Sequence, residues 1–161
     1  MTVDNVRLDE ILNRERRLFQ RVTDHLHRCR FIRPEDSRFT AGKIAALTLR
    51  ALEQHAEIEQ EVFDTVVGHW TREDMERQKI LGSQHHQLKG LCKDVRTVSQ
   101  YPKQYSKEHL CSLMLLLARM LSGHLEYEES DFWSKIVTEE KEFSGAVMSE
   151  LTRLEGELAA L

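Results

Sequence analysis

Two histidines in this chain are each followed, four residues later, by a glutamate. They stand in the segments HAEIEQEVF and HLEYEESDF, as His55 with Glu59 and His124 with Glu128. Residues four apart lie on one face of a helix, so each imidazole would project beside its carboxylate. Such nitrogen and carboxylate ligands suit iron and other divalent metals. A single spacing of this kind often arises by chance, but two on apolar helix faces predict a metal site.

Two more polar residues interrupt predicted apolar helix faces. Glu15 falls almost at the centre of the face formed by apolar residues of segment 8–29, and His85 lies on the flank of another. A buried carboxylate without a partner costs several kcal/mol, so a shared partner is expected. His25 lies at the edge of the first face and is the alternative ligand from that segment. For His85, the alternative is a surface position beside His86.

All these residues fall in segments that are predicted to be helices. The expected helices span 8–32, 40–68, 71–99, 106–136 and 139–161. Long helices with short connections form an antiparallel up-down-up-down four-helix bundle, so the expected class is all-α. The expected division is a bundle of residues 1–137 and an additional C-terminal helix within residues 138–161. Strands are not expected, because no segment sustains the alternation of apolar and polar residues.

Local signals predict where the helices end. The polar stretch Pro34–Ser37 is expected to close the first helix, and Thr40 is the expected N-cap of the second. Thr71 and Asp74 form an approximate capping box for the third helix. After a loop at residues 101–105, Ser106 is the expected N-cap of the fourth.

The C-terminal segment is helical by propensity and has one apolar stripe. The stripe consists of Phe143, Val147, Leu151, Leu154 and Leu158. This helix is expected to pack on the outside of the bundle or on a partner subunit, which would make a homodimer.

The predicted turns place the candidate ligands at one depth in the bundle. If the first two helices turn near residues 36–37, position 55 faces about position 18. If the next turns lie near residue 70 and within the loop 100–106, position 55 faces position 85, and position 85 faces roughly positions 121–124. One layer can then hold Glu15, His55, Glu59, His85, His124 and Glu128. Two metal ions would suit these six side chains, with Glu59 and Glu128 as bridges.

Composition narrows the class of protein. The 161 residues suggest one domain, and the formal net charge of -4 argues against a nucleic-acid binder. No apolar run is long enough for a transmembrane helix, and the N-terminus lacks the pattern of a signal peptide. The three cysteines, Cys29, Cys92 and Cys111, resemble reduced residues of a cytosolic protein. A cytoplasmic protein that does not bind membranes is therefore expected.

The segments quoted above resemble the helix motifs of the hemerythrin-like, or HHE cation-binding, family. QHHQLKGLCKDV and ILNRERRLF are similar to the family's third and first helix motifs, and the resemblance covers residues 8–136. It implies a four-helix bundle around a carboxylate-bridged centre of two non-haem iron ions, or of another divalent metal. It also implies that the protein binds or senses O2, NO or peroxide, or handles iron. Because the sequence indicates no separate substrate pocket, binding or sensing is expected rather than enzymatic turnover.

This chain departs from the family at three positions. It has Glu15 where the family usually has histidine and Lys89 where oxygen carriers have a second histidine of the third helix. In the fourth helix, oxygen carriers have an aspartate five residues after the histidine, whereas here Glu128 follows His124 by four residues. These departures favour a carboxylate-rich centre over an oxygen carrier. Two alternatives stay open: an interaction module with a degenerate or metal-free site, and an oxidase- or peroxidase-type enzyme.

Overall fold

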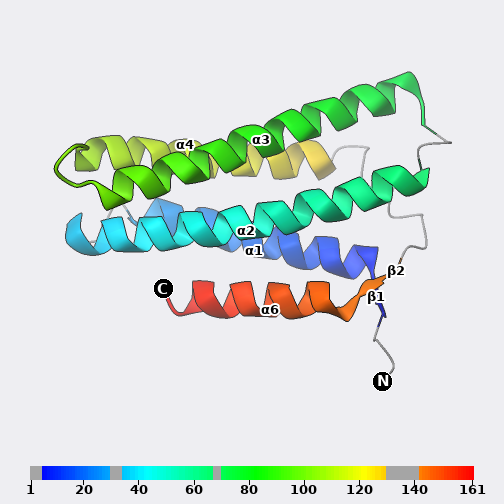
Figure 1. Ribbon diagram of the computed structural model, residues 1–161, viewed down its shortest axis with the longest axis horizontal. Helices are drawn as coiled ribbons and strands as arrows, with labels where there is room; N and C mark the ends of the chain where they lie inside the picture. The colour runs from blue at the N-terminus through cyan, green and yellow to red at the C-terminus, as the bar shows by residue number, and fades with distance from the viewer. Residues whose placement is uncertain (1–4, 30–33, 67–69, 130–141) are drawn as a thin grey trace.

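The computed structural model describes residues 5–29, 34–66, 70–129 and 142–161. Within these ranges four long helices pack side by side, and each runs opposite to the one before it (Figure 1). They are α1 (Leu8–Cys29), α2 (Pro34–Val66), α3 (Arg72–Gln100) and α4 (Lys107–Glu129). Contacts join α1 to α2, α2 to α3, α3 to α4 and α4 back to α1. The predicted all-α bundle is confirmed.

The described part of the C-terminal segment starts with a strand, which was not expected. β1 (Asn5–Arg7) pairs antiparallel with β2 (Glu142–Ser144), with Val6 opposite Phe143 (Figure 1). The prediction of a continuous helix from residue 139 is therefore wrong at residues 142–144. A short strand is stabilised by its hydrogen-bonding partner, and here that partner lies at the other end of the chain, where local propensity cannot detect it.

The additional helix, α6 (Gly145–Ala159), follows this strand directly. The Ser144 hydroxyl accepts a hydrogen bond from the Ala146 amide at 3.3 Å and caps the helix. α6 packs on α1 and α2 and buries Leu151, Leu154 and Leu158. Two hydrogen bonds, at 2.8 and 2.9 Å, join the Arg14 guanidinium of α1 to the Glu155 carboxylate of α6. These contacts place the C-terminal helix against the outside of the bundle.

The second helix begins six residues earlier than expected. Pro34 opens α2, so the stretch Pro34–Ser37 is helical and Thr40 is not its N-cap. Proline suits the first turn of a helix, because the amide hydrogen that it lacks would have no partner within the helix there. The expected parts of the helices at 30–32, 67–68 and 130–136 lie outside the described residues.

The remaining predicted helix ends are confirmed. The Thr71 hydroxyl accepts from the Asp74 amide at 3.1 Å, and the Asp74 carboxylate accepts from the Thr71 amide at 3.0 Å. This capping box satisfies two amides that the first turn of α3 leaves unpaired. The Ser106 hydroxyl accepts from the His109 amide at 3.1 Å at the start of α4. Residues 101–105 form the loop between these two helices.

Apolar side chains from all five helices that the structure describes fill the interior. Cys29 and Cys92 are buried within it and Cys111 is half-buried, and none of the three forms a disulfide. Of the helices that the structure describes, none has an apolar stretch sufficient to cross a membrane. The core is interrupted by one layer of charged and polar side chains, which forms the candidate site.

Candidate metal centre

Six ionisable side chains lie inside the bundle at one level. Each has at most 6 % of its surface exposed, although such groups are rarely buried without a partner. They are Glu15, His55, Glu59, His85, His124 and Glu128. All four helices of the bundle contribute to this layer, although α2 begins at Pro34, before the turn that was expected near residues 36–37.

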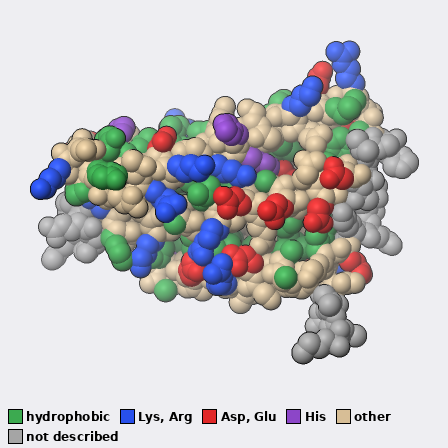
Figure 2. Space-filling view, in the orientation of Figure 1, with side chains coloured by type: hydrophobic (Ala, Val, Ile, Leu, Met, Phe, Trp, Pro, Cys, Tyr) green, Lys and Arg blue, Asp and Glu red, His purple; other side chains and the backbone are tan. Residues whose placement is uncertain are grey.

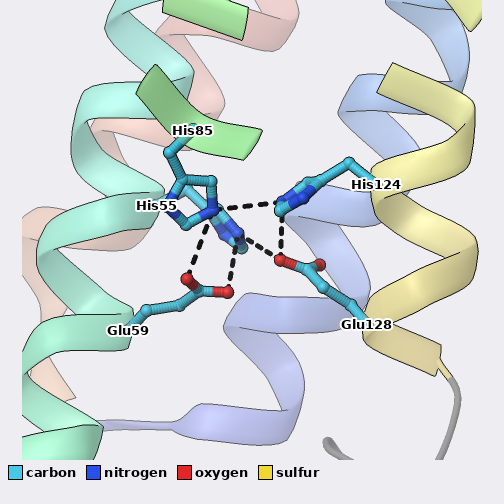
Figure 3. Close-up of side chains that lie close together, drawn as sticks. All are labelled: His55, Glu59, His85, His124 and Glu128. Atoms are coloured by element: carbon cyan, nitrogen blue, oxygen red, sulfur yellow. Dashed lines mark hydrogen bonds and ion pairs between the residues drawn. The ribbon is translucent and has the colours of Figure 1, made fainter. Parts of the chain in front are cut away.

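Five of the six converge on one point (Figure 3). One nitrogen or carboxylate oxygen from each lies within 4.8 Å of those from the others. The five are His55 and Glu59 of α2, His85 of α3, and His124 and Glu128 of α4. The spacing of four residues places each glutamate one turn from its histidine, so both side chains reach the same level. This buried cluster could hold a metal ion.

The three histidines present the same ring nitrogen to the centre. His55 Nε2 lies 2.7 Å from Glu128 Oε1, and His124 Nε2 lies 2.8 Å from the same oxygen. His85 Nε2 lies 3.1 Å from His124 Nε2. Three nitrogens directed at one point are the arrangement that a metal with imidazole ligands requires.

Glu59 joins two of these histidines through different oxygens. Its Oε1 lies 3.1 Å from His55 Nε2, and its Oε2 lies 3.2 Å from His85 Nε2. Within the described part of the chain, Glu59 Oε1 is buried and has no hydrogen bond of acceptable geometry. A buried carboxylate oxygen in this state is stabilised by a cation or a proton.

Glu15 of α1 lies on the far side of the His55 ring. Its Oε2 is 3.2 Å from His55 Nδ1, whereas His55 Nε2 faces the other ligands. Neither oxygen of Glu15 has a hydrogen bond of acceptable geometry to the residues that the structure describes. His25, the alternative from the same helix, is half-buried and does not belong to the cluster. The structure therefore brings Glu15, and not His25, to the edge of the centre.

Gln84 also contacts the cluster, and the sequence did not indicate this residue. Its Oε1 lies 2.7 Å from His124 Nδ1, so this nitrogen carries a hydrogen and donates it. The lone pair of a neutral His124 is then on Nε2, the nitrogen that faces the centre. Gln84 is half-buried on α3, and its polar type is ordinary for such a position. Only the packing of α3 against α4 reveals its partner.

The buried groups alter one another's pKa values. Burial raises the pKa of Glu59 to about 8, against the opposing effect of His55. Burial also raises the pKa of Glu15, although the charge of His55 partly offsets this. It lowers the pKa of His85 to about 3, and positive charge on His55 and His124 acts in the same direction. In the metal-free form, fewer side chains of the cluster are therefore charged than its six ionisable residues would suggest.

His55 and Glu128 shift each other's pKa values in opposite directions. Burial acts to lower the pKa of His55, but the carboxylates of Glu128, Glu15 and Glu59 raise it well above its ordinary value. Burial acts to raise the pKa of Glu128, but His55 and His124 hold it well below its usual range. Without a metal, His55 and Glu128 therefore form a buried ion pair.

Two pockets reach the cluster from different sides of the bundle. One, of about 270 Å³, lies between α1 and α4 and is lined by Glu15, His55 and Glu128 at its inner end. The other, of about 590 Å³, lies between α2 and α3 and is lined by Glu59 and His85. Neither pocket was apparent from the sequence, because each is formed by residues of two helices.

No family model, curated protein or solved structure with which the chain was compared matches it. Its class is therefore defined by its fold and its site alone. It is a four-helix bundle with a C-terminal helix and a buried cluster of histidine and glutamate that could hold metal ions.

Proposed function

We propose that this chain is a hemerythrin-like metal-binding protein. The cluster would hold a carboxylate-bridged centre of two non-haem iron ions, through which the protein binds or senses O2, NO or peroxide. The observation that carries the proposal is the convergence of three histidine Nε2 atoms and two glutamate carboxylates in an otherwise apolar core.

The chemistry of the donor set suits iron. Imidazole and carboxylate are ligands that ferrous and ferric ions accept, and cysteine is absent from the cluster that the described residues form. Glu59 Oε1 is buried with no hydrogen bond to any described residue, as expected of an oxygen that has a cation as its partner. When bound, iron would supply an open coordination position for a small ligand and would change its oxidation state.

The orientation of the two glutamates supports a centre of two ions. Glu59 directs one oxygen towards His55 and the other towards His85, which is how a carboxylate between two ions is shared. Glu128 Oε1 lies between His55 and His124. The three histidines and the two glutamates would hold the metal ions, with the histidines as terminal ligands and the carboxylates shared between the ions.

Residues around the cluster would hold these ligands in place. Gln84 accepts the hydrogen of His124 Nδ1 and so fixes the direction of its Nε2. Phe19 contacts the edge of the His55 ring, with the ring centroids 5.8 Å apart. Leu81 and Leu88, about one turn before and after His85 on α3, are fully buried. A ligand layer supported in this way needs little rearrangement to accept a metal.

The test is the metal content of protein purified without a metal-affinity tag, measured together with its absorption spectrum. Two irons per chain and a near-ultraviolet band support the proposal. A His124→Ala variant is expected to lose metal and this band. His109→Ala is the matched control, because His109 lies on the same helix but is exposed. Full metal retention by His124→Ala would exclude the assignment of His124 as a ligand.

One observation favours a second candidate, a metal-free interaction module. Glu128 pairs directly with His55 and His124, so part of the layer is satisfied without a metal. Such a network can fix the register of a bundle. A chelator would then leave the melting temperature unchanged, whereas a metal that binds only the folded state raises it.

A further inference from the structure

We propose that the pocket between α1 and α4 is the route by which a divalent cation enters the centre, and that Glu15 is its first buried ligand. The inference rests on the proposed metal-binding function. It assigns to Glu15 a role in transfer, distinct from that of a resident ligand.

The pocket connects the surface of the bundle to the cluster. Its outer part is lined by Asp9, Asn13 and Glu129, which are half-buried or exposed, and its inner part by Glu15 and Glu128. A divalent ion with six waters occupies about 180 Å³, since each water takes about 30 Å³. The pocket volume of about 270 Å³ exceeds this value.

The charge of the pocket favours cations at its inner end. At the rim, Asp9 pairs with Arg7 at 3.1 Å, and Glu129 pairs with Arg16, so these charges are largely neutralised. The inner end is lined by two carboxylates, Glu15 and Glu128, and by one imidazole, His55, so acidic groups outnumber basic ones there. The described residues that line the pocket contribute no lysine and no arginine besides Arg16. The attraction for a cation therefore increases towards the cluster.

The surroundings of Glu15 indicate a cation ligand independently of the volume and charge of the pocket. Glu15 is 2 % exposed, and neither oxygen accepts a hydrogen bond of acceptable geometry from the described residues. Its contact with His55 Nδ1, at 3.2 Å, lies on the side of the ring away from the centre. The carboxylate therefore lines the inner end of the pocket beside Glu128, where it can bind an ion and pass it on to Glu128.

The pocket between α2 and α3 carries different charges. Its lining includes Lys79 and Lys89, with Glu59 as its only carboxylate among the described residues. Figure 2 shows this face, with basic and histidine side chains over α3 and acidic side chains over α2. The lysines disfavour a cation directly above His85, so this pocket is the weaker candidate for entry.

The experiment measures the rate at which metal-free, full-length protein takes up Co²⁺, followed by visible absorption after rapid mixing. Glu15→Gln is expected to slow uptake by about tenfold, because it removes the inner charge. Arg16→Gln is expected to accelerate uptake severalfold, because it leaves Glu129 uncompensated. Opposite effects from adjacent residues cannot come from a general loss of folding. At saturation, both variants are expected to bind as much Co²⁺ as the wild type.

Lys89→Gln is the matched control for the other pocket, and its uptake rate is expected to stay within about twofold of the wild type. Faster uptake by Lys89→Gln alone would assign entry to the pocket between α2 and α3 and overturn the proposal. A lower Co²⁺ stoichiometry in Glu15→Gln would make Glu15 a resident ligand and also overturn it. An uptake rate that neither Glu15→Gln nor Arg16→Gln changes would exclude this route but not the proposed metal-binding function. Absence of any uptake by the wild type would overturn the proposed function itself.

Discussion

Replacing Glu15 by methionine is expected to stabilise the metal-free protein, although most substitutions in a core destabilise. The Glu15 carboxylate is buried and forms no hydrogen bond of acceptable geometry to the described residues, and burial raises its pKa. Methionine has a similar shape and no polar atom that needs a partner. The substitution therefore removes a desolvation penalty while the packing around α1 is retained.

The expected gain follows from the cost of an unsatisfied buried group, which is about 1–3 kcal/mol. The contact of Glu15 with His55 Nδ1 at 3.2 Å reduces the gain but supplies no hydrogen bond of good geometry. For a chain of 161 residues, each kcal/mol shifts the melting temperature by about 2–4 °C. A rise of about 2–12 °C is therefore expected.

Urea unfolding of chelator-treated protein, followed by circular dichroism, measures this effect. The midpoint should rise while the slope with urea stays constant, because the surface exposed on unfolding is unchanged. Glu57→Met is the control on an exposed position of α2, and it should change stability by less than about 0.5 kcal/mol. A loss of about 1 kcal/mol or more in Glu15→Met would refute the reasoning, because Glu15 would then stabilise the core through His55.

Three further predictions concern the same core. Burial raises the pKa of Glu59 to about 8. The protonated Glu59 carboxyl therefore contributes fully to stability below the pKa that it has in the unfolded chain, and this contribution is lost as the pH rises through 8. The free energy of unfolding of the metal-free protein, measured in urea titrations, should therefore fall by about 1 kcal/mol between pH 7 and 8. The same fall in a Glu59→Gln variant would contradict this. Gln84→Leu should weaken metal binding by about 10–100-fold in chelator competition, because it removes the partner of His124 Nδ1. Gln87→Leu, at an exposed position of the same helix, should not change the affinity. Equal affinities of the two variants would disprove the role of Gln84. Burial raises the pKa of the Cys92 thiol to about 12, so iodoacetamide at pH 8 should modify it only in urea, as mass spectrometry would show; rapid labelling of folded protein would contradict its burial.

The helical bundle was predictable because its pattern is local. The apolar residues of each helix recur at helical intervals, so the faces of α1 to α4 could be read from the chain. The capping box of Thr71 and Asp74 and the N-cap Ser106 depend on residues three apart and were also found. The start of α2 at Pro34 was misread, because proline both ends helices and suits their first turn.

The features that were missed depend on distant partners. β2 forms only because β1 lies beside it, more than 130 residues away in the chain. Gln84 contacts His124 across the packing of α3 against α4, and no property of its own sequence neighbours indicates that contact. The two pockets likewise exist only where neighbouring helices leave space between their side chains.

The sequence by itself determined which side chains are buried in the polar layer, because the helical period and the turn positions place six ionisable residues inside at one depth. Only the tertiary structure decided how they face one another. It directed three Nε2 atoms and two carboxylates at one point and left Glu15 behind the His55 ring. The physical reason is that a helical period specifies the face and level of a residue. The direction of its side chain depends on rotamers selected by packing against other helices.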